Sequence, residues 1–166
     1  MPERAKSRFS RLSPAVEARP IIRIQAEDFD VGAERARLEA GAGAVANFVG
    51  IVRGASDGRT LSALTIEHYP GMTENAATAI AQQAMSRWPL SGCTIIHRIG
   101  RLTPGSRIVL AAAASAHRAA ALEATAFLID WLKTDAPFWK HESFTNGDAA
   151  WVAARHEDDQ ARARWG

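Results

Sequence analysis

The spacing of apolar residues changes several times along the chain, as an architecture of mixed helices and strands requires. Apolar and polar residues alternate from Ile22 to Ala26, whereas the run from Ala44 to Val52 is apolar and partly β-branched, as in a buried strand. We predict strands at 22–26, 44–52, 61–68, 94–99, 107–114, 138–144 and 150–152, and helices at 31–40, 74–88 and 116–134. The order β-α-β-β-α-β-β-α-β-β predicts an α+β domain with helices packed on a mainly antiparallel sheet.

Capping residues and turn residues mark the ends of these elements. Asp30, Thr73 and Ser115 are positioned to cap the three predicted helices, and Pro89 ends the second helix. Tight turns are predicted at Thr103-Pro104-Gly105 and Asn146-Gly147. The apolar face of the longest helix is predicted from the spacing of three and four residues, at Ala119, Leu122, Ala126 and Ile129.

Two lysines lie close together in the sequence where the longest helix must end. Pro137 cannot continue a helix and forces the preceding residue into an extended conformation, so Lys133 lies on the last helical turn and Lys140 on the next segment. Their side chains can then converge, and two ammonium groups held close together usually require an anion between them. Considered alone, the pair is also consistent with two solvated surface lysines, one of them favoured by the negative end of the helix dipole.

Length and composition are typical of one soluble domain. The chain has 166 residues, of which 47% are hydrophobic, enough for one core. No apolar run approaches the roughly 20 residues of a membrane span, and residues 1–20 lack the apolar block of a secretory signal, so we expect a cytoplasmic protein. The single cysteine, Cys93, alternates with Ile95 and Ile99 and is expected to be a buried thiol, not a nucleophile.

Positive charge is concentrated at the amino terminus. Residues 1–20 carry five basic and two acidic side chains, or +3, against +2 for the whole chain, so the remainder is near −1. This segment is interpreted as a mobile basic arm, residues 21–155 as the folded domain and residues 156–166 as a charged tail or short exposed helix that Trp165 alone can anchor. The arm is consistent with a featureless tail, a nucleic-acid contact or an organelle transit peptide, although its two glutamates argue against the last.

We expect no metal and no cofactor. The five histidines have no i, i+4 spacing and no accompanying cysteine cluster, which argues against a zinc site. Gly41 and Gly43 follow a predicted helix but lack the third glycine and the preceding strand of a dinucleotide fingerprint.

A second group of cations is predicted at other element ends. Arg53 follows a strand, and His117 and Arg118 lie in the first turn of the longest helix, where free backbone N–H groups favour anions. His117 and Lys133 are sixteen residues apart, which separates them by roughly 24 Å along a helix. One small ligand cannot bridge that distance within one protomer. If both ends serve one site, a two-fold homodimer must provide it, with the helix start of one copy facing the helix end of the other.

Five ordered motifs resemble the large, catalytic subunit of molybdopterin synthase, over about residues 21–155. They are Phe48-Val49-Gly50-Ile51-Val52-Arg53, Glu67-His68-Tyr69-Pro70-Gly71-Met72-Thr73-Glu74, Ile96-His97-Arg98-Ile99-Gly100, Ser115-Ala116-His117-Arg118, and Leu132-Lys133-Thr134 through Pro137-Phe138-Trp139-Lys140. The terminal Asp-Gln through Arg-Trp is similar as well, whereas the amino-terminal arm lies outside the resemblance.

The resemblance implies a hammerhead-like single domain and a sulfurtransferase. Such enzymes convert cyclic pyranopterin monophosphate into molybdopterin by installing two dithiolene sulfurs in molybdenum cofactor biosynthesis. The sulfur arrives as a thiocarboxylate at the Gly-Gly end of a small ubiquitin-like subunit, and two large subunits dimerise centrally in a heterotetramer. By motif, Lys133 and Lys140 match the family's essential lysines, Arg53 its strand-end arginine, and His117 and Arg118 the pair supplied by the neighbouring protomer.

Physical roles follow for these residues. Arginine presents a planar fork suited to phosphate, and cations fixed in a dry cleft stabilise anionic intermediates. Nearby cations and partial burial both lower the pKa of a lysine, which makes Lys133 or Lys140 suitable for acid–base chemistry. Our hypothesis assigns proton transfer and thiocarboxylate contact to Lys133, and substrate charge to Lys140; His117 is a further proton carrier. The alternative is a non-catalytic α+β module that docks a partner protein or nucleic acid, although the near-neutral body disfavours nucleic acid.

Overall fold

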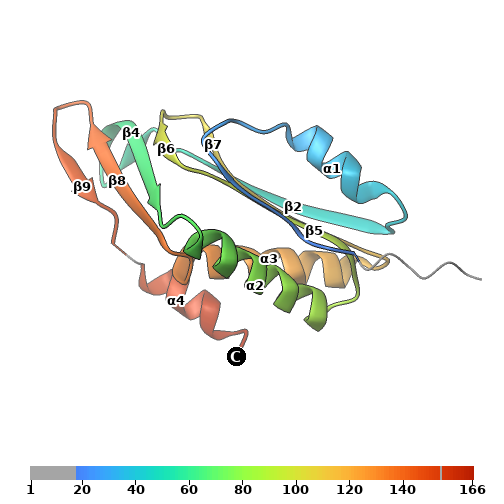
Figure 1. Cartoon of the computed structure of the whole chain (residues 1–166). Coiled ribbons are helices and arrows are strands. Elements are labelled where there is room, and N and C mark those ends of the chain that lie inside the picture. The colour runs from blue at the N-terminus through green and yellow to red at the C-terminus, as the bar shows by residue number, and fades with distance from the viewer. Residues whose placement is uncertain (1–17, 154) are drawn as a thin grey trace, which may run out of the picture.

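The computed structural model describes residues 18–153 and 155–166 (Figure 1). Its strands are β1 (Ile21–Gln25), β2 (Ala44–Ile51), β3 (Ala55–Ser56), β4 (Arg59–His68), β5 (Leu90–Arg98), β6 (Gly100–Leu102), β7 (Arg107–Ser115), β8 (Phe138–Phe144) and β9 (Ala149–Trp151). Its helices are α1 (Val31–Glu39), α2 (Met72–Arg87), α3 (Arg118–Thr134) and α4 (His156–Ala163). The predicted α+β fold and element order are confirmed, with the short β3 and β6 as additions. Most of the basic arm, residues 1–17, lies outside the described residues, so its interpretation remains a prediction.

The strands form two sheets that are mainly antiparallel, as predicted. One sheet has the order β1-β5-β7-β2, and the other has the order β3-β4-β8-β9 with β6 also paired to β4. Only the β1–β5 pair is parallel among the described strands. The hairpin predicted around the turn at Thr103 is present, because β5 and β7 pair with Thr94 opposite Ala112. β2 stands at one end of its sheet.

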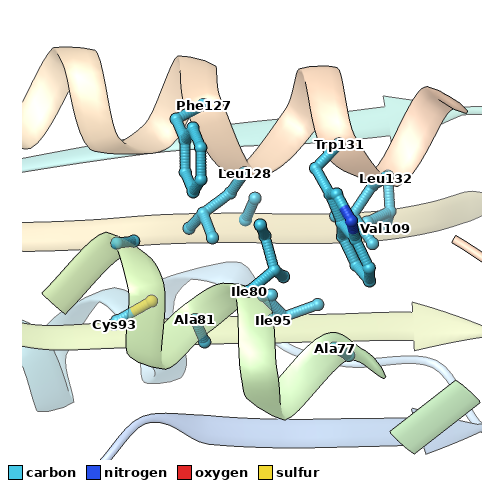
Figure 2. Close-up of a cluster of buried hydrophobic side chains, with 12 residues drawn as sticks. Ala77, Ile80, Ala81, Cys93, Ile95, Val109, Phe127, Leu128, Trp131 and Leu132 are labelled. Atoms are coloured by element: carbon cyan, nitrogen blue, oxygen red, sulfur yellow. The ribbon is translucent and has the colours of Figure 1, made fainter. Parts of the chain in front are cut away.

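Helices cover both faces of the four-stranded sheet (Figure 1). α1 packs on one face through Leu38, which joins a cluster with Phe29 and Leu110. α2 and α3 pack on the other face, and Figure 2 shows Ile80 of α2 and Leu128 of α3 meeting over the sheet. This second cluster is the larger core. Cys93 lies within it, so the predicted burial of this thiol is confirmed, and burial raises its pKa to about 12.

The predicted apolar face of α3 is wrong. The side that packs into the core carries Ala121, Ala124, Phe127, Leu128 and Trp131. The predicted stripe lies on another side, where Leu122 is 60% exposed, Ala119 is exposed, and Ala126 and Ile129 are only half-buried. The reason is that α3 is apolar on more than one side, so its periodicity does not identify the buried one.

Two of the three predicted helix caps are also wrong. Asp30 caps α1 as expected, because its carboxylate accepts a hydrogen bond from the N–H of Ala33. Gly71 is the N-cap of α2, and Thr73 is instead buried, where its hydroxyl donates to the carbonyl oxygen of Pro137 at 3.2 Å. The N-cap of α3 is His117, and Ser115 ends β7 with its hydroxyl donating to Pro89. In both cases the hydroxyl joins segments distant in sequence.

The carboxyl-terminal residues form the helix α4, and this segment packs on α3. Trp165 packs edge-to-face on Phe127, and its indole N–H donates to the Asp130 carboxylate at 2.7 Å. Trp165 is therefore an anchor, as predicted. It is not the only one, because Arg162 and Arg164 of this segment form ion pairs with carboxylates at the end of α3. None of the helices that the structure describes combines the length and apolar character needed to cross a membrane.

Candidate active site

The structure brings together three of the five predicted site residues. Lys133, Lys140 and Arg53 all line a cavity of about 250 Å³ between β2 and α3. Lys133 lies in the last turn of α3, Lys140 on β8, and Arg53 in the segment after β2. The convergence expected from the Lys-x6-Lys spacing is present, while the roles of these residues remain predictions.

The end of α3 explains why the two lysines meet. The helix stops at Asp135, whose N–H donates to the carbonyl oxygen of Trp131 at 2.9 Å. Pro137 follows and prevents further helix, and its carbonyl oxygen is held by the Thr73 hydroxyl. The chain then enters β8, which pairs with β4 so that Lys140 lies opposite Ile66. A tight helix-to-strand transition thus directs both amines to one cavity.

Lys140 has an unusual protonation equilibrium. Burial of its side chain and, to a lesser extent, the neighbouring Lys133 ammonium lower the pKa from 10.5 to about 8, while the Asp158 carboxylate partly opposes both effects. At pH 7, a pKa of about 8 leaves about a tenth of the molecules with a neutral Lys140 amine. A neutral amine can accept a proton, whereas an ordinary lysine cannot at this pH.

His97 is a residue of this cavity that the sequence did not identify as functional. Its side chain belongs to β5, is only 2% exposed and stacks on the Phe138 ring at 3.8 Å between ring centres. Burial and the nearby Lys140 lower the pKa of the imidazole to about 3, so the ring is neutral. Nδ1 lies 2.8 Å from the carbonyl oxygen of Arg98; donation from Nδ1 leaves Nε2 as an acceptor. The available signal was a histidine directly after the apolar pair Ile95-Ile96 in a predicted strand.

A second cavity of about 380 Å³ adjoins the first and is more mixed in charge. It shares Arg53, Lys133 and Lys140 with the first cavity. Its wall adds acidic and basic groups from β8 and the C-terminal segment, namely Glu142, Arg155, Glu157 and Asp158. Sequence reasoning missed these residues, because α4 folds back on α3 through contacts between segments about 30 residues apart.

The remaining predicted pair, His117 and Arg118, lies at the opposite end of α3. His117 is the N-cap, Arg118 is the first helical residue, and both are exposed. One continuous helix separates them from Lys133 by roughly 24 Å. Within one chain they do not join the lysine cavity, and the shared site remains a prediction.

The cavity is suited to anionic ligands. Three cationic side chains surround a partly apolar space in which charge interactions are stronger than in bulk water. Among residues 18–153 and 155–166, no group of three or more histidine, cysteine, aspartate or glutamate side chains is arranged to hold a metal ion. Arg53 can bind phosphate with two parallel hydrogen bonds, and the lysines can stabilise developing negative charge.

The chain is similar to known proteins in both sequence and structure. The family model described as "MoaE protein" matches residues 24–135. The molybdopterin synthase catalytic subunit of Ralstonia nicotianae is 52% identical over 150 residues, which cover 89% of this chain and 85% of that protein. Among solved structures, the molybdopterin biosynthesis MoaE protein of Burkholderia ambifaria superposes with a TM-score of 0.75 at 47% identity, covering 89% of this chain and 98% of that one. Molybdopterin synthase of Staphylococcus aureus gives 0.73 at 31% identity, covering 79% and 96%.

Proposed function

The chain belongs to the MoaE protein family, and we therefore propose that it is the catalytic subunit of a molybdopterin synthase. In this role it transfers sulfur from the C-terminal thiocarboxylate of a small ubiquitin-like subunit to cyclic pyranopterin monophosphate, forming the dithiolene of molybdopterin. The observation that carries the proposal is the convergence of Lys133, Lys140 and Arg53 on one cavity. All three side chains come from motifs that carry the resemblance.

The charges of the reactants fit this cavity. The substrate carries a cyclic phosphate and the sulfur donor is an anionic thiocarboxylate. Sulfur transfer passes through anionic tetrahedral states at carbon, and opening of the cyclic phosphate places further negative charge on phosphate oxygens. Fixed cations in a partly enclosed space stabilise such states more than they stabilise the separate reactants. We assign phosphate binding to Arg53, because its guanidinium matches the geometry of phosphate oxygens.

We assign proton transfer and contact with the thiocarboxylate to the two lysines. The lowered pKa of Lys140 supports assigning proton transfer to this residue, in place of Lys133, which the sequence alone favoured. Lys133 is more exposed and lies at the rim of the same cavity, where it can meet an incoming thiocarboxylate. The neutral His97 beneath them adds no third positive charge to the pair.

Assembly is part of the proposal. The small subunit supplies the sulfur, and two copies of this chain form a central homodimer within a heterotetramer, in the cytoplasm. The partner's His117 and Arg118 then complete each cavity, because the two residues of the same chain are too distant. No cofactor, metal or nucleic acid takes part.

Reconstitution tests the function directly. Purified protein mixed with a thiocarboxylated small subunit and cyclic pyranopterin monophosphate should yield molybdopterin. Lys133→Ala should abolish turnover without lowering the midpoint of the unfolding transition. The matched control is Arg35→Ala, which alters an exposed ion pair on α1 and should leave turnover intact. Absence of turnover by the parent protein would favour the non-catalytic binding module, and normal turnover by Lys133→Ala would remove the catalytic assignment.

A further inference from the structure

His97 is a buried polar side chain to which the proposed reaction assigns no contact. The alternation along β5 places it on the same face as Cys93 and Ile95, which is the face that α2 and α3 cover. Its side chain is only 2% exposed, yet it lines the cavity that holds Lys133 and Lys140, which we call the lysine cavity. Burial of an imidazole costs free energy unless its nitrogens find hydrogen-bond partners.

One ring nitrogen of His97 has a partner and the other does not. Nδ1 lies 2.8 Å from the carbonyl oxygen of Arg98, and donation along this line leaves the lone pair on Nε2. No group among residues 18–153 and 155–166 donates a hydrogen bond to Nε2. This atom is not sealed inside the core either, because Nε of Arg23 is the one fully buried side-chain nitrogen or oxygen that lacks a partner in the described part of the chain. The Nε2 lone pair is therefore open to the lysine cavity.

The imidazole is held in one orientation. It stacks on the Phe138 ring with 3.8 Å between ring centres and 17° between ring planes. Phe138 begins β8, and Lys140 follows two residues later on the same face of that strand. The segment around Arg98 is also fixed, since its guanidinium donates to two carbonyl oxygens of other segments. The lone pair of Nε2 therefore has a defined direction before any ligand binds.

This lone pair has the opposite polarity to the other polar groups of the lysine cavity. The remaining polar side chains that line it, Arg53, Lys133 and Lys140, present only donors in their charged forms. Arg53 and Lys133 are exposed, whereas His97 is buried. Burial and the two ammonium groups lower the pKa of the imidazole to about 3, so His97 stays neutral near pH 7 and keeps its lone pair. The cavity thus combines cationic donors at its rim with a neutral acceptor inside.

We propose that Nε2 of His97 accepts a hydrogen bond from a hydroxyl or a ring N–H of the substrate and thereby fixes how the substrate lies among the cations. The inference rests on the proposed function and adds a contact for the uncharged part of the substrate. A reduced pyranopterin carries ring N–H donors, whereas its phosphate and a thiocarboxylate present acceptors. The lone pair repels acceptors, so it favours the orientation with the phosphate toward Arg53 and a donor group toward the interior.

Packing alone does not explain a histidine at this position. A side chain needed only to stack on Phe138 requires no polar atoms, and phenylalanine would fill the same place without the cost of burying an imidazole. A side chain needed only for the Arg98 carbonyl requires one donor and no second nitrogen. The free lone pair is a cost to the folded chain that a donor on the substrate recovers when it binds.

Three substitutions separate the acceptor from the structural contacts of the ring. His97→Asn keeps a donor for the Arg98 carbonyl but has no atom at the position of Nε2. His97→Phe keeps the stacking on Phe138 but has no acceptor. His97→Gln loses both structural contacts, yet its amide oxygen can reach the position of Nε2. A purely structural role predicts that glutamine is the most harmful replacement, whereas our proposal predicts that it is the least harmful.

Binding to the full-length chain, measured by titration calorimetry without the small subunit, tests the contact. His97→Asn and His97→Phe should each weaken the binding of cyclic pyranopterin monophosphate by roughly 10-fold or more, because a substrate donor is left unpaired. Both should bind inorganic sulfate, which presents acceptors only, as the parent does, and His97→Gln should keep most of the affinity for the pyranopterin. Thr94→Val is the matched control, since Thr94 is buried on the opposite face of β5.

These affinities can also contradict the proposal. An equal loss of affinity for sulfate and pyranopterin would show that the substitutions disturb the cavity as a whole, and would overturn the contact. Lowest affinity in His97→Gln would do the same. Asparagine and phenylalanine disturb different structural contacts, so either variant that retains the parental unfolding midpoint decides the question.

Two further readouts follow the hydrogen bond directly. In ¹⁵N spectra of the parent, the Nε2 resonance should move upfield when cyclic pyranopterin monophosphate is added and stay in place when sulfate is added. An Nε2 resonance that does not move at saturation would show that water keeps this position, and would overturn the contact. In the reconstituted reaction, His97→Asn should raise KM and leave kcat largely unchanged, because the bond is already formed in the bound substrate.

The outcomes distinguish this inference from the proposed function. Parental turnover together with unchanged pyranopterin affinity of His97→Asn and His97→Phe would refute the His97 contact and leave the sulfurtransferase intact. Substrate binding with the expected ¹⁵N shift, but no turnover with a thiocarboxylated small subunit, would refute the reaction and support the contact. A parent chain that does not bind the pyranopterin at all would refute both.

Discussion

Replacing Lys140 by methionine should stabilise the folded protein at neutral pH. Burial and the Lys133 ammonium lower the pKa of Lys140 from 10.5 to about 8. Each pKa unit corresponds to about 1.36 kcal/mol, so at pH 7 the charged amine destabilises the folded state by about 3 kcal/mol relative to a solvated lysine. Methionine has similar length, no charge and enough flexibility to fill the same space. We expect the free energy of unfolding to rise by up to about 3 kcal/mol, or roughly 6–12 °C in Tm.

The stability gained by Lys140→Met should depend on pH in a definite direction. Between pH 8 and pH 10.5 the unfolded chain keeps the Lys140 proton that the folded chain has lost, so the free energy of unfolding of the parent rises with pH in this window. The methionine variant lacks this contribution. Its advantage is therefore largest below pH 8 and disappears near pH 10.5, where lysine is neutral in both states.

Urea unfolding at pH 7.0 and pH 9.5, followed by tryptophan fluorescence at equal protein concentrations, measures the difference. Lys133→Met is the matched comparison: it relieves only the charge repulsion on Lys140, which is the smaller cause, and should stabilise the fold less. The reasoning would be refuted by a Lys140→Met protein no more stable than the parent at pH 7.0, or by an advantage that is the same at pH 9.5. Turnover should be lost together with the gain in stability, as expected when a catalytic group is held in an unfavourable environment.

Three further predictions concern other parts of the molecule. The ring resonances of His97 should not titrate between pH 5 and pH 8 in NMR spectra, because burial lowers its pKa to about 3; a midpoint near 6.5 would contradict this. Gly43→Ala should cost about 3 kcal/mol in urea unfolding, since a Cβ there would lie 2.2 Å from the Ala116 carbonyl oxygen, whereas Gly54→Ala, with open space, should cost less than about 1 kcal/mol. Trp165→Ala should cost about 2–3 kcal/mol and increase amide exchange in α4, and unchanged exchange would show that the ion pairs suffice.

Elements with one buried face were predictable from the sequence. β4, with its apolar alternation, and α1, with its Asp30 cap, follow directly from period and local hydrogen bonding. The very short strands β3 and β6 were missed, because two or three residues carry no detectable period and pair only when a neighbouring strand is already in place. Thr73 and Ser115 were misassigned as caps for the same reason: each hydroxyl bonds to a distant segment.

The candidate active site likewise contains residues that a local rule predicts and residues that only the tertiary fold brings into place. Lys133 and Lys140 were predictable because Pro137 fixes where the helix ends, and a local rule then brings both side chains to one place. His97 was not predictable by such a rule. Its position depends on the tertiary fold, which stacks its ring on Phe138, 41 residues further along the chain. The lining of this cavity therefore combines one locally determined feature with contacts that only the tertiary fold creates.

The misassigned stripe of α3 has a physical explanation of its own. A helix that packs on one core needs one apolar side, and α3 has two: the buried one around Leu128 and the outward one around Leu122. Polar residues on the outward side of α3 would make the isolated chain more soluble than the apolar residues found there. The apolar edge strand β2 lies next to this side and increases the apolar surface exposed to water. Both features would be stabilising if a second surface covered them together. The homodimer that we propose would also bring the opposite ends of α3 together, so it would give the apolar periodicity and the separation of His117 from Lys133 one cause.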